Sequence, residues 1–553
     1  MAITMPGTPV FNKKILFIDD THVLKVDNLH RKTNAAAKHP QPVLAMDSTW
    51  DNPGDELSGT NVLYDADEGL FKLWYGVSTR IVDWGAATRK EAYATSRDGI
   101  HWERPHLNLV EHQGPDGVAS KTNNYFLNEE VEEFNAGIIL DPHDAPVRRY
   151  KMICTASSIY DSGKVTDWVR HHVPMNLVTS EDGIHWDRPA FINPVLRGVS
   201  DGPFSIFYDR DRRVYQLFTR RVPNLPRDIS LYESHDLVNW EDCGRIFVAG
   251  DEQDPPTLYN IHQVAVLQYE GYRLALLNTM HHHPLSEELG VFQAPPDDYP
   301  GADRIGKIDL QLGYSIDGRQ WHRAHDRSEV VPLGRPGEPD AGMMFPANNP
   351  PVVLDGDTYI YATTCPYGHT AWDQERVFQT NRRDLRKSAH LMLAVMPEDH
   401  WVSFDAGATE GTLLAGPWRI RPHAMTINAD AEGGSIEIEL VDGYERPLPG
   451  LSRAECVPIT ANGKGQTIRW KGDPHPDEIE GEYRGGVMAR IYMKNAKLYS
   501  CTLSYPDPSG ALRRYWGNFE WNRNLFHRRD QWDGRSHLPA EGIPGITRGM
   551  LNY

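Results

Sequence analysis

One short motif recurs four times along the chain and restricts the fold more than any other feature. It places a serine, then an aspartate two residues later, then a tryptophan four residues after the aspartate. Serine and aspartate side chains cap the backbone of a turn, and the glycine that follows the aspartate in three copies supplies a positive φ. Because each copy follows a short apolar run, the motif predicts a strand, a turn and a return strand. The copies are Ser96–Trp102, Ser180–Trp186, Ser234–Trp240 and Ser315–Trp321.

A second pattern is a hairpin with an apolar strand, an acidic turn and a strand that carries Tyr or Trp. Its five copies span 62–76, 138–153, 204–220, 264–277 and 351–363. A hairpin followed by the serine–tryptophan turn makes a four-stranded sheet, and such sheets repeated radially are the blades of a β-propeller. We therefore predict an all-β fold with a five-bladed β-propeller over 45–408. Pro397–Trp401 is interpreted as a degenerate turn of the fifth blade.

The rest of the chain lacks this repeat. Residues 409–505 alternate apolar and polar side chains between turn residues, which predicts a β-sandwich after the propeller. The extension 1–44 contains an apolar run at 15–24 that we expect to be a strand closing the propeller ring. The extension 506–553 is rich in aromatic residues and arginine, and we expect it to pack on the propeller or to join two subunits in a homo-oligomer.

Charge and cysteine content exclude several classes of protein. The chain has 57 Lys and Arg against 76 Asp and Glu, a net charge of −19, so we expect neither nucleic acid nor an anionic membrane as a partner. No apolar window is long enough for a transmembrane helix. The five cysteines are scattered, and the N-terminus lacks the pattern of an ordinary secretory signal. These features favour a cytoplasmic protein without a disulfide framework.

The chain resembles a known group of proteins. It is similar to the five-bladed propeller glycosidases of glycoside hydrolase families 32, 43, 68 and 117, and most of all to bacterial proteins similar to the family 32 N-terminal domain. The invertase motif of that family is absent, and its nearest counterpart is Trp50–Pro53. The segments that carry the resemblance are Leu16–Asp20, Lys38–Pro40, Phe71–Tyr75, Ile427–Asp430 and Gly434–Ile436. The resemblance implies a glycosidase with a C-terminal β-sandwich.

Acidic residues that precede the innermost strands of a propeller converge at one mouth of its channel, although they lie far apart in sequence. Glycoside hydrolysis needs one carboxylic acid to protonate the leaving oxygen and a second carboxylate as nucleophile or base. We predict Asp51 as nucleophile or base, Asp340 or Glu338 as acid and Asp201 as the orienting carboxylate. The residues expected to contact substrate are Trp50, Glu133, Asp254, His262 and Arg220.

These residues favour an exo-acting glycoside hydrolase for short oligosaccharides, without a cofactor. Three alternatives stay open: a carbohydrate lyase, a glycoside phosphorylase that binds phosphate through Arg220/Arg221 or Arg382/Arg383, and a non-catalytic carbohydrate-binding propeller. Each acid taken singly also fits the role of a loop cap. Histidines at 171–172, 262 and 281–283 leave room for a structural divalent ion in the channel, although no zinc-binding spacing supports one.

Overall fold

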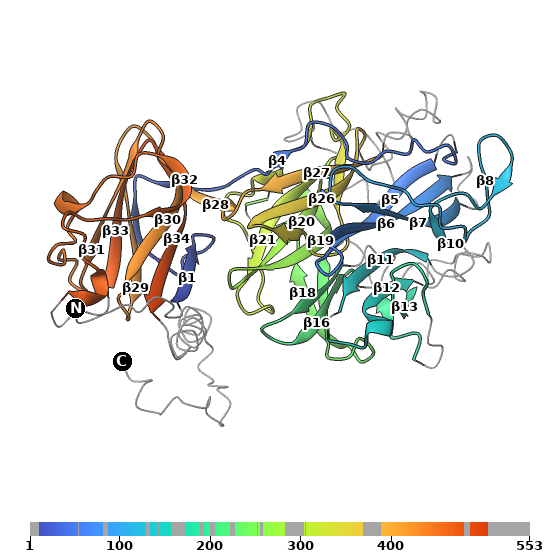
Figure 1. The fold of residues 1–553 in the computed structure, drawn as a ribbon, viewed down its shortest axis with the longest axis horizontal. Coiled ribbons are helices and arrows are strands. Elements are labelled where there is room, and N and C mark those ends of the chain that lie inside the picture. The colour runs from blue at the N-terminus through green and yellow to red at the C-terminus, as the bar shows by residue number, and fades with distance from the viewer. Residues whose placement is uncertain are drawn as a thin grey trace.

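The computed structural model describes residues 10–52, 55–80, 87–128, 133–141, 143–155, 173–187, 192–199, 205–221, 227–250, 253–254, 258–281, 304, 306–368, 389–479 and 487–506. Its described part consists of strands and of three short 3₁₀ turns, η1 (Pro146–Arg148), η4 (Arg453–Glu455) and η5 (Pro476–Glu478). Figure 1 shows a propeller on the right and a sandwich on the left. The predicted all-β class is confirmed. Within these residues, no helix has the length and apolar character needed to cross a membrane.

Strand pairing in the described part of the propeller gives five antiparallel groups. The first group is β5 (Asp55–Asp65), β6 (Leu70–Arg80), β7 (Ala87–Ser96) and β10 (Tyr125–Asn128). The second is β11 (Glu133–Leu140), β12 (Tyr150–Thr155), β13 (Val173–Ser180) and β14 (Leu196–Val199). The third is β15 (Ser205–Asp209), β16 (Val214–Thr219), β17 (Ile229–Ser234) and β18 (Glu241–Phe247). A small hairpin, β8 (His112–Gln113) and β9 (Ala119–Ser120), belongs to the segment before β10.

The last two groups share one sheet through a single parallel bridge between Ile308 and Met343. They are β19 (Leu258–Tyr269), β20 (Tyr272–His281) and β21 (Ile308–Ser315) with the short β22 (His322–Arg323) and β23 (Glu329–Val331); and β24 (Met343–Pro346), β25 (Val352–Leu354), β26 (Asp357–Cys365), β27 (His390–Met396) and β4 (Ala37–Lys38).

The first strands of the groups surround the propeller axis. Strand β5 contacts β11, β11 contacts β15, β15 contacts β19, β19 contacts β24, and β26 returns to β5. Side-chain amides bridge these strands where their backbones do not pair. The Asn61 Oδ1 atom accepts a hydrogen bond from the Ile138 N–H at 2.9 Å, and Asn349 Oδ1 accepts one from the Val62 N–H at 2.8 Å.

The recurring serine–tryptophan motifs form the predicted turns between the third and fourth strands. In the first copy, the Gly99 N–H donates to Ser96 Oγ at 2.9 Å and the Ile100 N–H donates to Asp98 Oδ1 at 2.9 Å. The other copies repeat the contact with serine. Gly99 has φ +74°, and in the third copy Leu237 takes the corresponding place at φ 65°.

Two kinds of side-chain contact join neighbouring blades. In the first kind, a side chain on the second strand of one blade donates to the glycine carbonyl of the next blade's turn. These pairs are Trp74 with Gly183 (2.6 Å), Gln216 with Gly318 (2.8 Å) and Tyr361 with Gly99 (2.8 Å). In the second kind, the aspartate that ends or follows an innermost strand accepts from the second strand of the next blade. These pairs are Asp65 with Tyr150 (2.6 Å), Asp141 with Tyr215 (2.5 Å) and Asp209 with Arg273 (2.6 Å).

The sandwich includes the N-terminal segment, which corrects one prediction. We expected 15–24 to close the propeller ring, but β1 (Val10–Leu16) pairs with β34 and β2 (Val23–Asp27) pairs with β29. Only the short β4 joins the propeller, at the outer edge of the fifth group. One sheet holds β1, β3 (His30–Thr33), β28 (Val402–Ala406), β30 (Ala424–Asp430), β32 (Asn462–Thr467) and β34 (Ala496–Pro506); the other holds β2, β29 (Gly411–Trp418), β31 (Ser435–Val441) and β33 (Val487–Lys494).

The turn glycines give a first testable prediction. A Cβ atom on Gly99 would lie 2.3 Å from Tyr361 Oη, and the residue has φ +74°. We expect Gly99→Ala to lower the free energy of unfolding by at least about 2 kcal/mol, because a strained φ and an interblade overlap act together. Gly244→Ala is the matched control, since its φ is +89° with no atom within 4 Å. Equal losses in urea unfolding of the two variants would contradict the interblade role.

The buried interblade aspartates predict a pH dependence of stability. Burial alone would raise the pKa of Asp65, but the hydrogen bond from Tyr150 and the charge of Lys72 lower it to about 2. A depressed pKa stabilises the fold above the unfolded-state value near 4, and this stability is lost as the pH falls toward 2. We expect Asp65→Asn to remove on the order of 2 kcal/mol at pH 7 and much less at pH 2.5. Asp67→Asn, at an 88 % exposed side chain, should change stability little at either pH in unfolding titrations.

Candidate active site

A pocket of about 150 Å³ lies at the propeller axis. Its walls come from the start of β5, from β19, from β24 and the residues after it, and from the end of β26. The pocket is therefore built from blades that are far apart in sequence. Its lining residues are Glu56, Leu57, Ser58, Gly59, Thr60, His262, Gln263, Met343, Phe345, Pro346, Asn348, Thr363, Thr364, Cys365 and Ala389.

Glu56 is the carboxylate among the described residues of this lining, and sequence reasoning missed it. The sequence prediction concerns acids that precede the innermost strands, whereas Glu56 is the second residue of β5. The alternation at the start of β5 was the available signal, because Glu56 and Ser58 share one face of the extended strand before the bulge that follows Ser58. That polar face lines the axis, where a strand surrounded by other strands would normally carry apolar side chains.

His262, one of the predicted substrate-binding residues, also lines the pocket. It belongs to β19, and its imidazole packs edge-on against the Phe345 ring with centroids 5.4 Å apart. The histidine and Glu56 enter the pocket from the fourth and first blades. A carboxylate and an imidazole in one axial cavity can bind hydroxyl groups and transfer protons.

The structure places Asp51 near the outermost strand of the first blade, not in the axial pocket. Its side chain is 5 % exposed and accepts a hydrogen bond from the Ser48 N–H at 2.8 Å, while Tyr125 Oη of β10 lies 3.4 Å away. Arg104 approaches the carboxylate to 3.6 Å. Burial raises the pKa of Asp51 to about 6, against the opposing effects of Ser48 and Arg104. This proton site is separate from the lining of the axial pocket.

Trp50 lies beside Asp51 and is held by the same blade. Its indole N–H donates to Asn124 Oδ1 at 3.0 Å, and its ring meets the His106 ring edge-on at 5.4 Å. The Trp50 carbonyl is in hydrogen-bond contact with His112 Nε2 at 2.9 Å. These contacts orient Trp50 within the first blade, and it does not line the axial pocket.

Asp340 and Glu338 lie together in the loop before β24, outside the axial pocket. The Asp340 carboxylate is 3 % exposed and pairs at 2.5 Å with Lys38 of the outermost strand β4. Glu338 accepts the Arg335 N–H at 2.7 Å, which is the turn-capping contact that a loop acid makes. The structure therefore does not bring this pair together with Asp51.

Asp254 and Arg220 are both buried but differ in location. Asp254 pairs with Arg323 of β22 at 2.6 Å, which directs it toward the outer part of the fourth group. Arg220 directly follows β16 and is 4 % exposed. Because Phe218 pairs with Ser205 at the start of β15, Arg220 lies near the beginning of that innermost strand.

Several predicted residues fall outside the described part of the chain. Asp201, the histidines at 171–172 and 282–283 and the arginines at 382–383 belong to this set. Glu133 begins β11 and is paired in register with Thr155, but its side chain is also outside the description. The roles predicted for these residues stay predictions.

The described histidines and cysteines do not favour a metal centre. His281 is hydrogen-bonded at 3.0 Å to Asp309, whose carboxylate also forms an ion pair with Arg304. One group of possible ligands is Glu233, Glu241 and Cys243. Within this group, the guanidinium groups of Arg212 and Arg319 already neutralise the Glu233 carboxylate, which therefore does not need a metal ion to balance its charge.

Comparisons with known proteins give similarity in fold only. No family model and no curated protein matches this chain. Solved structures described as glycoside hydrolases match this chain. A putative glycosidase from Bacteroides thetaiotaomicron is 13% identical, with 69% of this chain and 96% of the other covered and a TM-score of 0.38. A thermostable family-43 glycoside hydrolase is 13% identical, with 63% and 92% covered and a TM-score of 0.37.

A third solved structure comes from the GH130 family of mannoside phosphorylases, which its description says contains glycoside hydrolases that target β-1,2-mannosidic linkages in Candida mannan. It is 15% identical, with 66% of this chain and 94% of the other covered and a TM-score of 0.37. At identities and TM-scores this low, none of these similarities assigns an activity to this chain.

The buried proton site at Asp51 gives a testable prediction. Its raised pKa means that stability falls as the pH rises from the unfolded-state value near 4 through about 6, because a buried carboxylate must then ionise. We expect Asp51→Asn to stabilise the protein by about 2 kcal/mol at pH 8 and to have little effect at pH 4. Asp47→Asn is the control, because the Asp47 side chain lies close by and is 76 % exposed. A gain in unfolding free energy that is the same at both pH values would contradict burial of the Asp51 charge.

Proposed function

We propose that this protein is a glycoside hydrolase that removes terminal sugars from short oligosaccharides at the axial pocket. The supporting observation is the placement of Glu56 and His262 in that pocket, which several blades build. At about 150 Å³ the cavity is smaller than a usual pocket for a whole ligand. A small cavity at the axis suits one terminal ring and favours exo action over binding along a chain.

Glu56 is the proposed acid or base of the reaction. Hydrolysis of a glycosidic bond needs two carboxyl groups, at roughly 5–5.5 Å for retention or 6.5–9.5 Å for inversion. The sequence supplies two acids near the starts of neighbouring innermost strands, Asp201 before β15 and Glu133 in β11. We propose Asp201 as the second carboxylate, which keeps it among the catalytic residues predicted from the sequence. His262 is proposed to bind a sugar hydroxyl.

A glycoside phosphorylase is the second candidate, and the buried Arg220 is the observation that favours it. The side chain is 4 % exposed and lies near the start of β15. Guanidinium groups bind phosphate with paired, charge-assisted hydrogen bonds. A phosphorylase would use phosphate where a hydrolase uses water, so its product would be a sugar phosphate.

The test is turnover of a panel of oligosaccharides and aryl glycosides, followed by proton NMR with and without inorganic phosphate. We expect phosphate-independent release of a single terminal sugar. Glu56→Gln and Asp201→Asn should each lower turnover by at least ~10³, because a general acid or base is lost while the side-chain shape is kept. The anomer formed first distinguishes retention from inversion.

The control is Glu432→Gln, at an exposed glutamate in a turn of the sandwich, which should keep full turnover. Full activity of Glu56→Gln, with an unchanged thermal midpoint, contradicts the proposed site. A sugar phosphate that forms only with inorganic phosphate decides for the phosphorylase.

A further inference from the structure

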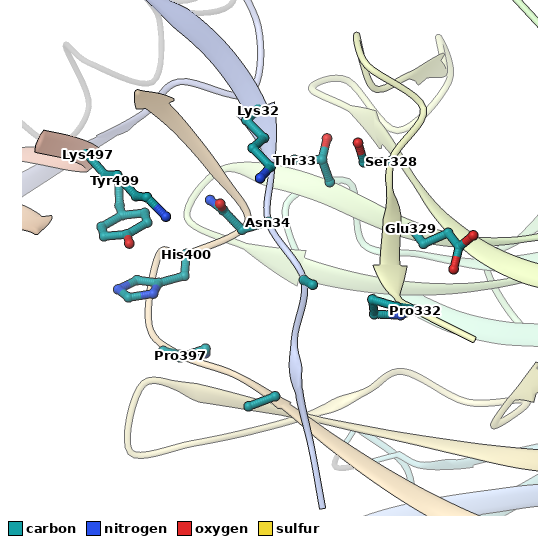
Figure 2. Close-up of a pocket in the computed structure, with 12 residues that line it drawn as sticks. Lys32, Thr33, Asn34, Ser328, Glu329, Pro332, Pro397, His400, Lys497 and Tyr499 are labelled. Atoms are coloured by element: carbon teal, nitrogen blue, oxygen red, sulfur yellow. The ribbon is translucent and has the colours of Figure 1, made fainter. Parts of the chain in front are cut away.

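A second and larger cavity, of about 640 Å³, lies between the propeller and the sandwich. Figure 2 shows its walls. The sandwich contributes residues of β3 and β34, the propeller contributes the segment around β23, and the connections at 34–37 and 397–400 complete the lining. The axial pocket and this cleft share no lining residue, so the cleft is a separate site.

Two lysines and one asparagine line this cleft. Figure 2 shows Lys32, Asn34 and Lys497 around the same space. The Asn34 Nδ2 atom is buried and has no hydrogen-bond partner among the described residues. Neither lysine has an ion pair within the described part of the chain, although each side chain lines the cavity. Because the Asn34 nitrogen is buried, the ammonium groups of Lys32 and Lys497 are the donors that a ligand in the cleft can reach.

The carboxylates near these donors have other partners. Glu329 pairs with Arg304 at 2.7 Å and accepts the Leu333 N–H at 2.9 Å. Asp405 and Asp430 both lie opposite Lys497 in the strand register; Asp405 accepts from Ser403 Oγ at 2.5 Å and Asp430 accepts from the Glu432 N–H at 3.2 Å. Of these carboxylates only Glu329 has a cationic partner that the structure describes, and Lys32 and Lys497 are the cationic groups of the cleft lining that an anion could bind.

An aromatic pair forms the wall next to the donors. The His400 and Tyr499 rings stack with centroids 3.7 Å apart and an angle of 10° between their planes. Burial lowers the pKa of His400, so the imidazole is uncharged at neutral pH. Flat, uncharged rings bordered by polar groups are surfaces on which the apolar face of a sugar ring packs.

We propose that this cleft is an accessory site for an acidic saccharide. Its carboxylate would bind Lys32 and Lys497, and its ring would lie along the His400–Tyr499 stack. The proposal stands on the cleft alone and does not depend on the reaction at the axial pocket. It adds to the proposed hydrolase a place, apart from the axial pocket, where a charged sugar is held.

The test is calorimetric titration of the full chain with digalacturonic acid, and with its neutral counterpart galactobiose in parallel. We expect saturable binding of the acidic disaccharide and at least tenfold weaker binding of the neutral one. The double variant Lys32→Gln/Lys497→Gln should lose at least ~tenfold in affinity, because two charge-assisted hydrogen bonds become neutral ones. Lys25→Gln, at an exposed lysine of β2, is the matched control and should bind as the parent chain does.

Two further variants distinguish binding in this cleft from binding in the axial pocket and from simple anion binding. Glu56→Gln should bind the acidic disaccharide unchanged, whatever its effect on turnover. His400→Ala should weaken the disaccharide but not inorganic sulfate, because only the sugar uses the ring. Equal binding of the acidic and neutral disaccharides, unchanged binding in the folded double variant, or loss of binding in Glu56→Gln would each overturn the proposal. Sulfate that competes as strongly as the disaccharide would reduce the cleft to a simple anion site and overturn the saccharide assignment.

Discussion

The hydrogen bonds between neighbouring blades are the interaction on which this structure depends. Among the described residues, no continuous backbone ladder joins the innermost strands of different blades, so side chains hold the ring together. Asp65 and Asp209 accept from Tyr150 and Arg273 of the next blade, and Tyr361 reaches the Gly99 carbonyl to close the ring. These groups are buried, and a buried acceptor or donor that loses its partner costs far more than an exposed one.

This way of building the ring divides the acidic residues into two sets. Aspartates at the far ends of the innermost strands are used in the joints between blades, so part of the −19 net charge has a structural role. Residues at the beginnings of those strands are left to line the axis, and Glu56 is the described carboxylate in this place. The amide bridges made by Asn61 and Asn349 keep the strands around the pocket fixed.

Among the contacts between the sandwich and the propeller, the buried carboxylate of Asp399 brings together strands of both. Asp399, in the degenerate fifth turn, pairs with Lys14 of β1 at 3.0 Å and accepts from Ser500 Oγ of β34 at 2.7 Å. From the propeller side, Tyr269 Oη donates to the same side chain at 2.8 Å. Because strands from both domains meet at Asp399, the joint fixes the relation of the walls that border the 640 Å³ cleft next to it.

The sequence by itself determined the repeat, the turns and the all-β class, because a turn such as Ser96–Trp102 depends on contacts within a few residues. The sandwich strands after 409 followed from alternation in the same way. Tertiary structure alone decided which acids face the axis and that residues 10–33 belong to the sandwich. Asp340 illustrates the reason: its position before a strand was readable, but its partner Lys38 is 302 residues away, and only the closed ring brings them together. Glu56 reaches the pocket through the same closure.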